Sequence, residues 1–260
     1  MIPKIIHYVW LSNEPKDAII KDYMDSWLLR NPGYTVKCWN TENFDININK
    51  FVFDSVKIKK WAFASDYIRM YALYTDGGIY LDSDVLVNKS FDDYLNFNFF
   101  SAVEYHPEVV QNEVMSKFID ENGNPTNTVD GVPGIGIQAA IMGAEKGCQF
   151  AKDCLDWYDS HSEIVEDKTY GKLIAPGLYA YLAEKYGFKY KDEQQILKLS
   201  EDKTLLIEPS KVFCTVGHET DESIAVHMCN GSWRPTYKKK TFTQNLYDNL
   251  LRIYHKMFRK

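Results

Sequence analysis

The amino-acid sequence predicts an α/β fold whose first half is built on a parallel β-sheet. Residues 5–10 and 35–39 are short apolar runs typical of strands, and residues 17–30 between them have the apolar spacing of a helix. So short a strand–helix–strand unit is typical of a right-handed parallel crossover. The 260 residues are 45% hydrophobic and 25% charged, a globular composition that excludes disordered, collagen-like and coiled-coil proteins.

Each predicted element has a local reason in the sequence. The first strand is apolar at nearly every position, as expected where a sheet is covered on both faces. Asn31-Pro32-Gly33 ends the first helix, and Gly77-Gly78 ends a second helix expected over residues 57–76. The remaining expected elements are extended pieces or strands at 79–81, 85–87, 99–103, 137–142, 205–209 and 224–228, a polar loop at 111–136, and helices at 147–160 and 176–186.

The charge of the chain is distributed unevenly. The net charge is −6, yet residues 234–260 hold eight Lys or Arg and one acid, so this stretch carries +7 and the rest −13. An acidic body argues against a nucleic-acid partner. We therefore expect a single domain over residues 1–233 and a basic amphipathic helix over 234–260. That helix would either dock on the domain or lie on an anionic membrane surface.

Cysteine usage and hydropathy indicate the compartment. The five cysteines are odd in number and include no C-x-x-C pair, which favours reduced thiols in the cytoplasm. The first ten residues predict a strand without a signal-peptide cleavage site, and no stretch reaches the about 20 apolar residues of a membrane span. We expect a cytoplasmic protein that at most contacts a membrane peripherally.

The clearest chemical motif is Asp82-Ser83-Asp84 directly after the strand at 79–81. Residues two apart in an extended chain point to the same side, so the two carboxylates lie close together. Clustered carboxylates suit Mg²⁺ or Mn²⁺, although a solvated turn would have the same sequence. A calcium EF-hand loop is excluded, because the sixth position is Val87 and the twelfth is Asp93.

Four further residues gain interest from their positions. Asp66 and Arg69 share a helix face. One interpretation is a surface ion pair, and the other is that the Gly77-Gly78 turn brings both groups next to the carboxylates. Trp10 ends the first strand, where its indole either packs in the core or stacks on a nucleobase. His227 follows a late strand, as a structural residue or a metal ligand. Ligands of such sheets bind at the carboxyl ends of strands, where Trp10 and the acidic motif both fall.

These segments together resemble a known family. The stretches IPKIIHYVWLS, ASDYIRMYALYTDGGIYLDSDV and HMCNGSW are similar to the DXD glycosyltransferases of family 32, which include the yeast initiating α-mannosyltransferase and bacterial capsule and lipopolysaccharide enzymes. The glucosyltransferase domains of clostridial toxins are related to this family. The resemblance implies a GT-A fold, that is, a single Rossmann-like nucleotide-binding domain with a mixed central sheet and helical insertions. It also implies a nucleotide-sugar donor, a divalent metal and retention of anomeric configuration.

The resemblance assigns roles residue by residue. It implies Asp82, Asp84 and His227 as metal ligands and Asp66, Arg69 and Asp84 as catalytic residues. The donor-binding residues that it implies are Val9, Trp10, Asp66, Arg69, Ser83, Gln138, Ser232 and Trp233. One departure concerns the segment IMGAEKGC, near whose start the family usually has an Asn that contacts the sugar. Ala139 stands at that position here, beside Gln138.

The sequence thus predicts a metal-dependent hexosyltransferase of the bacterial cytoplasm or of the inner face of the plasma membrane. Its donor would be a UDP-sugar rather than a GDP-sugar, with Mn²⁺ or Mg²⁺, and its acceptor a saccharide or lipid-linked saccharide in surface polysaccharide synthesis. Two alternatives stay open. An aspartyl-nucleophile Mg²⁺-dependent phosphatase also begins with D-x-D after a strand, but the sequence has no convincing downstream acidic pair for its metal. A catalytically dead sugar-binding module would keep the same residues.

Overall fold

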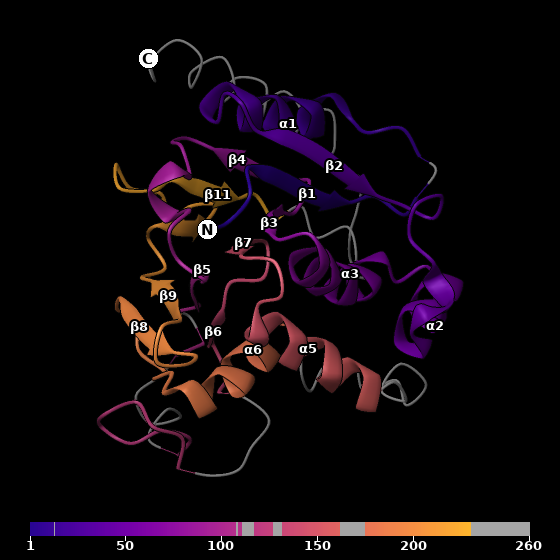
Figure 1. Cartoon of the computed structure of the whole chain (residues 1–260). Helices are drawn as coiled ribbons and strands as arrows, with labels where there is room; N and C mark the ends of the chain where they lie inside the picture. The colour runs from indigo at the N-terminus through magenta and orange to yellow at the C-terminus, as the bar shows by residue number, and fades with distance from the viewer. Residues whose placement is uncertain (13, 108, 111–116, 127–131, 162–174, 230–260) are drawn as a thin grey trace. The chain divides into compact units, whose positions relative to one another are not determined.

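A computed structural model describes residues 1–12, 14–107, 109–110, 117–126, 132–161 and 175–229 (Figure 1). Residues 1–229 form one compact unit. The helix predicted for 234–260 and residues 111–116 and 127–131 of the loop predicted for 111–136 lie outside the described residues. The described helices are α1 (Ala18–Arg30), α2 (Lys50–Lys57), α3 (Trp61–Thr75), α5 (Gln149–Ser160) and α6 (Ala175–Ala183), with single-turn 3₁₀ helices at Ile46–Ile48, Asp92–Tyr94 and Glu184–Tyr186.

The central sheet is mixed, as predicted. Its strands follow the order β2-β1-β3-β7-β5-β9-β8, with β6 beside β5. β1 pairs in parallel with both β2 and β3, whereas β7 runs antiparallel between β3 and β5. Because β7 opposes both neighbours, β3 and β5 end at the same edge of the sheet. The strands are β1 (Ile5–Val9), β2 (Thr35–Trp39), β3 (Gly78–Leu81), β5 (Phe99–Tyr105), β6 (Ile135–Ile137), β7 (Ile141–Ala144), β8 (Gln195–Lys198) and β9 (Thr204–Glu208).

The inner strands β3, β5, β7 and β9 are buried on both faces, so each contributes side chains to two hydrophobic cores. In β3, Ile79 and Leu81 belong to the core that contains Trp27 of α1, whereas Tyr80 belongs to the core that contains residues of α2, α3, α5 and α6. Figure 1 shows α1 and α3 on opposite sides of β1 and β2. The arrangement explains why the first strand is apolar at nearly every position.

A second, small sheet has the order β10-β11-β4 and consists of β10 (Phe213–Thr215), β11 (Ala225–His227) and β4 (Val85–Val87). Its β4 follows the acidic motif directly, and β11 pairs antiparallel with β4 so that His227 lies opposite Val85. Trp27 fixes the start of β4 by donating an indole hydrogen bond to the carbonyl of Val85 at 2.8 Å. The small sheet therefore brings the late histidine to the acidic motif.

The turn between α3 and β3 brings α3 back onto the sheet. Gly78 has a φ of 114°, and a Cβ there would lie 2.6 Å from the carbonyl oxygen of Ile5 and 2.9 Å from His7 Nε2. Buried His7 in turn shares a 2.7 Å hydrogen bond through Nε2 with the carbonyl of Gly77. Only a glycine fits here, because the backbone of β1 passes directly against the turn.

Some elements differ from the prediction. The helix expected at 57–76 begins at Trp61, and a separate helix, α2, precedes it, capped by the side chain of Asn49. The strand expected over 137–142 is two strands, β6 and β7, which pair antiparallel with different stretches of β5, Val103–Tyr105 and Phe99–Phe100. Neither β8 nor β10 was predicted, because the alternation of β8 covers only four residues and Phe-Cys-Thr of β10 has no strand pattern.

Candidate active site

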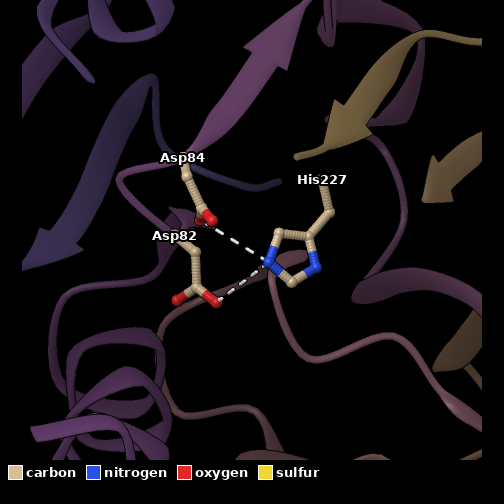
Figure 2. A group of neighbouring side chains, drawn as sticks. All are labelled: Asp82, Asp84 and His227. Carbon is tan, nitrogen blue, oxygen red and sulfur yellow. Dashed lines mark ion pairs between the residues drawn. The ribbon is translucent and has the colours of Figure 1, made fainter. Parts of the chain in front are cut away.

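Three metal-ligating side chains converge where β3, β4 and β11 meet. Ligand atoms of Asp82, Asp84 and His227 all lie within 4.8 Å of one another. The imidazole Nε2 is 3.5 Å from Asp84 Oδ1 and 4.0 Å from Asp82 Oδ2, and Figure 2 shows both carboxylates pointing toward the same edge of the ring. The side chains keep 27%, 13% and 21% exposure, so a ligand can reach them.

Backbone hydrogen bonds hold the two carboxylates in place. The amide of Asp82 donates to the carbonyl of Ala140 at 2.9 Å, and the amide of Val85 donates back to the carbonyl of Asp82 at 3.0 Å. The amide of Met228 donates to the carbonyl of Asp84 at 3.0 Å. The acidic turn is thereby tied to the segment before β7 on one side and to the end of β11 on the other.

The predicted pair on α3 lies beneath this cluster. The Arg69 guanidinium lies 3.0 Å from Asp66 Oδ1 and 3.5 Å from Asp82 Oδ1, and it donates to the carbonyl of Ala139 at 2.8 Å. Arg69 is 4% exposed and Asp66 9%. The pair is therefore not a solvated surface ion pair. The guanidinium instead joins the helix, the acidic turn and the segment before β7.

Tyr80 belongs to this network, a role that was not predicted from the sequence. Its hydroxyl donates to Asp82 Oδ1 at 2.7 Å, and the Arg69 guanidinium lies 4.9 Å from the centre of its ring. The side chain is 1% exposed. The two-residue repeat of a strand could have indicated this contact, because residues 80 and 82 are two apart and so face the same side.

The electrostatics of the site follow from burying several charges together. Burial raises the pKa of Asp66 to about 7, with Arg69 opposing the rise and the charge of Asp82 adding to it. Burial alone would lower the pKa of His227, but its hydrogen bonds with Asp84 and Cys229 and the charge of Asp84 hold that pKa well above its usual value. The two carboxylates therefore attract positive charge, which the imidazolium supplies here.

The donor set fits a divalent cation. Two carboxylates and one imidazole are oxygen and nitrogen ligands that suit Mn²⁺ or Mg²⁺ and leave coordination positions for phosphate oxygens. A cation at Nε2 would take the place of the proton that His227 carries in its ion pairs. Cys229 Sγ lies 3.4 Å from the other ring nitrogen, Nδ1, so that nitrogen is already engaged.

The structure also places the other predicted donor-binding residues. Val9 and Trp10, both half-buried, end the first strand, and the indole of Trp10 donates to the carbonyl of Glu14 at 3.0 Å. Half-buried Ser83 lies between the two aspartates. Gln138 is 1% exposed and accepts a 3.0 Å hydrogen bond from the amide of Ala140 through its side chain. Ser232 and Trp233 lie outside the described residues.

The chain matches a known family over about a third of its length. Residues 18–101 match the family described as the glycosyltransferase sugar-binding region containing the DXD motif. This range includes Asp66, Arg69, Asp82 and Asp84, but neither Trp10 nor His227. The match confirms the predicted resemblance for the part of the chain that carries the acidic motif.

Two relatives and one solved structure are similar to the chain. An uncharacterized glycosyltransferase of Acanthamoeba polyphaga mimivirus is 32% identical over 108 residues, or 38% of this chain and 42% of that protein. The subversion of eukaryotic traffic protein A of Legionella pneumophila is 28% identical over 127 residues, or 38% of this chain and 20% of that protein. The chain thus spans less than half the length of these relatives.

The solved structure is PaToxG glycosyltransferase, with a TM-score of 0.51 and 17% identity, covering 71% of this chain and 69% of that one. This likeness concerns the fold alone, and it confirms the predicted glycosyltransferase architecture with a mixed central sheet. Among the described residues, no helix is long and apolar enough to cross a membrane.

Proposed function

We propose that this chain, which carries the DXD-containing sugar-binding region of glycosyltransferases over residues 18–101, is a retaining hexosyltransferase that uses a nucleotide-sugar donor. The observation that carries the proposal is the convergence of Asp82, Asp84 and His227 within 4.8 Å, above the buried pair Asp66–Arg69. A diphosphate is the part of such a donor that needs a divalent cation, and this cluster supplies its protein ligands.

The chain's own residues have distinct tasks in this proposal. A bound Mn²⁺ or Mg²⁺ would neutralise the negative charge that develops on the leaving diphosphate. Arg69, whose donors already reach Asp66, Asp82 and the carbonyl of Ala139, orients the carboxylates and places a fixed positive charge next to them. The Asp66 side chain, 13% exposed, faces the cluster and would accept hydrogen bonds from hydroxyls of the donor sugar.

The nucleotide would lie over the end of β1. Trp10 is half-buried there, and Lys16 Nζ lies 4.7 Å from the centre of its indole ring. A stacked base therefore uses the opposite face of the indole or displaces Lys16. We favour a UDP-sugar over a GDP-sugar, and a saccharide or lipid-linked saccharide as acceptor in surface polysaccharide synthesis. We propose that the acceptor hydroxyl attacks from the front face, which gives the retention that the family resemblance implies.

A donor-hydrolysis assay tests this function against its two alternatives. The protein is incubated with a panel of UDP- and GDP-sugars with Mn²⁺ and, separately, with EDTA. We expect slow, Mn²⁺-dependent release of the sugar from one donor. Release of phosphate from simple phosphate esters would instead support the phosphatase. A protein that gains thermal stability with a nucleotide-sugar but hydrolyses none would be a binding module, since a ligand that binds only the folded state stabilises it.

A further inference from the structure

The chain that carries β6 and β7 has more residues than β5 can pair. Phe99–Phe100 pair with β7, and Val103–Tyr105 pair with β6. Between these two stretches β5 has two residues, Ser101 and Ala102, whereas the opposite chain has five, residues 138–142. The opposite chain therefore bulges out of the ladder, and we call residues 138–142 the β6–β7 bulge.

Both stretches lie along the same edge of β5. The carbonyl of Asn98 accepts from the amide of Glu145 at 2.9 Å, and the carbonyl of Ala102 accepts from the amide of Gln138 at 2.8 Å. In an extended strand, carbonyls that are an even number of residues apart face the same neighbour. β6 and β7 are thus one neighbour of β5 that the bulge interrupts, and bulges of this kind commonly redirect groups next to active sites.

The β6–β7 bulge directs two backbone carbonyls at the candidate active site. The carbonyl of Ala139 accepts from the Arg69 guanidinium at 2.8 Å, and the carbonyl of Ala140 accepts from the amide of Asp82 at 2.9 Å. Arg69 in turn lies 3.5 Å from Asp82 Oδ1. The position of the bulge therefore sets where the guanidinium and the acidic turn meet.

Ser101 holds the bulge from the opposite strand. Its side chain is fully buried in β5, and its hydroxyl donates to the carbonyls of Gln138 at 2.8 Å and Ile141 at 3.0 Å. These two residues stand on either side of Ala139 and Ala140. Because a buried carbonyl needs a donor, one hydroxyl here takes the place of ladder hydrogen bonds and fixes the chain before and after the two alanines.

Packing alone would favour an apolar residue at this position. The neighbours of Ser101 in β5, Phe100 and Ala102, are apolar and as deeply buried. Burying a hydroxyl is unfavourable unless it finds a hydrogen-bond partner. Gln138 supports the same geometry, because its side-chain oxygen accepts from the amide of Ala140 at 3.0 Å. The benefit of the Ser101 hydroxyl therefore lies in the geometry of the bulge.

We propose that Ser101 is a positioning residue of the candidate active site, which holds the β6–β7 bulge so that its carbonyls fix Arg69 and the amide of Asp82. The proposal rests on the proposed function and adds to it a residue that touches neither the donor nor the cation. Without the hydroxyl, the bulge relaxes and both partners lose a fixed acceptor. Residues that orient metal ligands in this way commonly change metal affinity by about 10–100-fold.

The test compares Ser101→Ala with a matched control far along the sheet. Gln195 in β8, the last strand of the order, is buried, and its side-chain amide donates to the carbonyls of Lys189 at 2.9 Å and Lys191 at 3.2 Å. Gln195→Leu therefore also takes one buried donor away from two backbone carbonyls, but neither of them belongs to the bulge. Ser101→Cys fills nearly the same space with a weaker donor, and it replaces Ser101→Ala in every measurement if that variant does not fold.

Three measurements trace the effect from the bulge to the reaction. In the metal-free protein, hydrogen exchange of the Asp82 amide reports its bond to the bulge, and we expect about tenfold faster exchange in Ser101→Ala. The Mn²⁺ affinity in the presence of UDP should fall about tenfold. At saturating Mn²⁺, kcat of donor hydrolysis should fall about tenfold while the donor KM changes less than about twofold, because the nucleotide contacts at Trp10 are untouched. In Gln195→Leu all three quantities should stay within about twofold of wild type, because the change is remote.

Unchanged exchange of the Asp82 amide in a folded Ser101 variant would overturn the proposal. An unchanged Mn²⁺ affinity in that variant, or an equal loss of Mn²⁺ affinity in Gln195→Leu, would also overturn it. Failure of the proposed function looks different, because the wild-type protein would then hydrolyse no nucleotide-sugar. In that event the exchange of the Asp82 amide still decides whether Ser101 holds the acidic turn, since that measurement needs neither metal nor donor.

Discussion

At the residue scale, the two carboxylate oxygens of Asp82 have different partners. Oδ1 accepts from the Tyr80 hydroxyl at 2.7 Å and lies 3.5 Å from Arg69, whereas Oδ2 is the oxygen nearer to His227. One oxygen is thus occupied by the protein, and the other faces the position that a cation would take. Partners of this kind commonly tune metal affinity by 10–100-fold.

We expect Tyr80→Phe to weaken Mn²⁺ binding by about tenfold, because the variant keeps the ring beneath Arg69 but frees Asp82 Oδ1 to turn. Isothermal titration with Mn²⁺ in the presence of UDP measures the change. Tyr94→Phe is the matched control, since the Tyr94 hydroxyl donates to Glu208 Oε1 at 3.3 Å, on a different carboxylate. Equal loss of Mn²⁺ affinity in both variants would mean that Tyr80 acts through general stability and not through Asp82.

At the element scale, the turn between α3 and β3 decides whether the helix pair meets the acidic motif. Gly78→Ala places a Cβ 2.6 Å from the carbonyl of Ile5 at a φ of 114°. We expect a loss of more than about 3 kcal/mol in the free energy of unfolding, from backbone strain and from the clash with β1. Gly187→Ala is the control, because Gly187 has a φ of 94° but no atom within 4 Å of the added Cβ.

Urea denaturation of both variants separates the two contributions. Gly187→Ala should lose about 1–2 kcal/mol, which is the usual cost of a left-handed backbone for an L-residue. If Gly78→Ala lost no more than Gly187→Ala, the close approach of β1 to the turn would contribute nothing, and the turn would need glycine only for its φ.

The same elements show what local sequence could predict. The run from Asp66 to Asp84 is one helix, one glycine turn and one strand, so its convergence follows from short-range patterns. The placement of His227 depends on β11 pairing with β4, about 140 residues away in the chain. Its position after a late strand left a structural and a metal-ligand role open, and the family resemblance favoured the ligand. The small sheet also needs β10, whose residues Phe-Cys-Thr carry no strand pattern. Contacts between distant short strands are set by packing, not by local preference.

At the scale of the whole molecule, buried His7 links stability to pH. Its Nε2 is 2.7 Å from the carbonyl of Gly77, and its Nδ1 accepts from the Trp39 indole at 3.1 Å, so the folded protein holds it neutral. Burial lowers its pKa, partly offset by the hydrogen bond to Gly77. The unfolded chain binds a proton at this residue as the pH falls through about 6.5, whereas the folded chain does not.

We therefore expect this residue to make folding less favourable as the pH falls below about 6.5, by at most about 1.4 kcal/mol per pH unit. Asp66 acts in the opposite sense, because its folded pKa of about 7 stabilises the folded state at lower pH. The test is the difference between wild type and His7→Gln in urea denaturation from pH 7.5 to 5.5, since Asp66 contributes equally to both. A difference that does not change with pH would show that His7 is not held neutral.

In the proposed function, Asp82, Asp84 and His227 hold a divalent cation for a nucleoside diphosphate. The most direct measurement is titration of Mn²⁺ in the presence of UDP, followed by the electron paramagnetic resonance signal of free Mn²⁺. It uses the wild-type protein, Asp84→Asn and the control Asp202→Asn, which changes an exposed acid between β8 and β9. We expect one UDP-dependent Mn²⁺ site in wild type and in Asp202→Asn, and its loss in folded Asp84→Asn. Equal Mn²⁺ binding by all three proteins would show that Asp84 holds no cation.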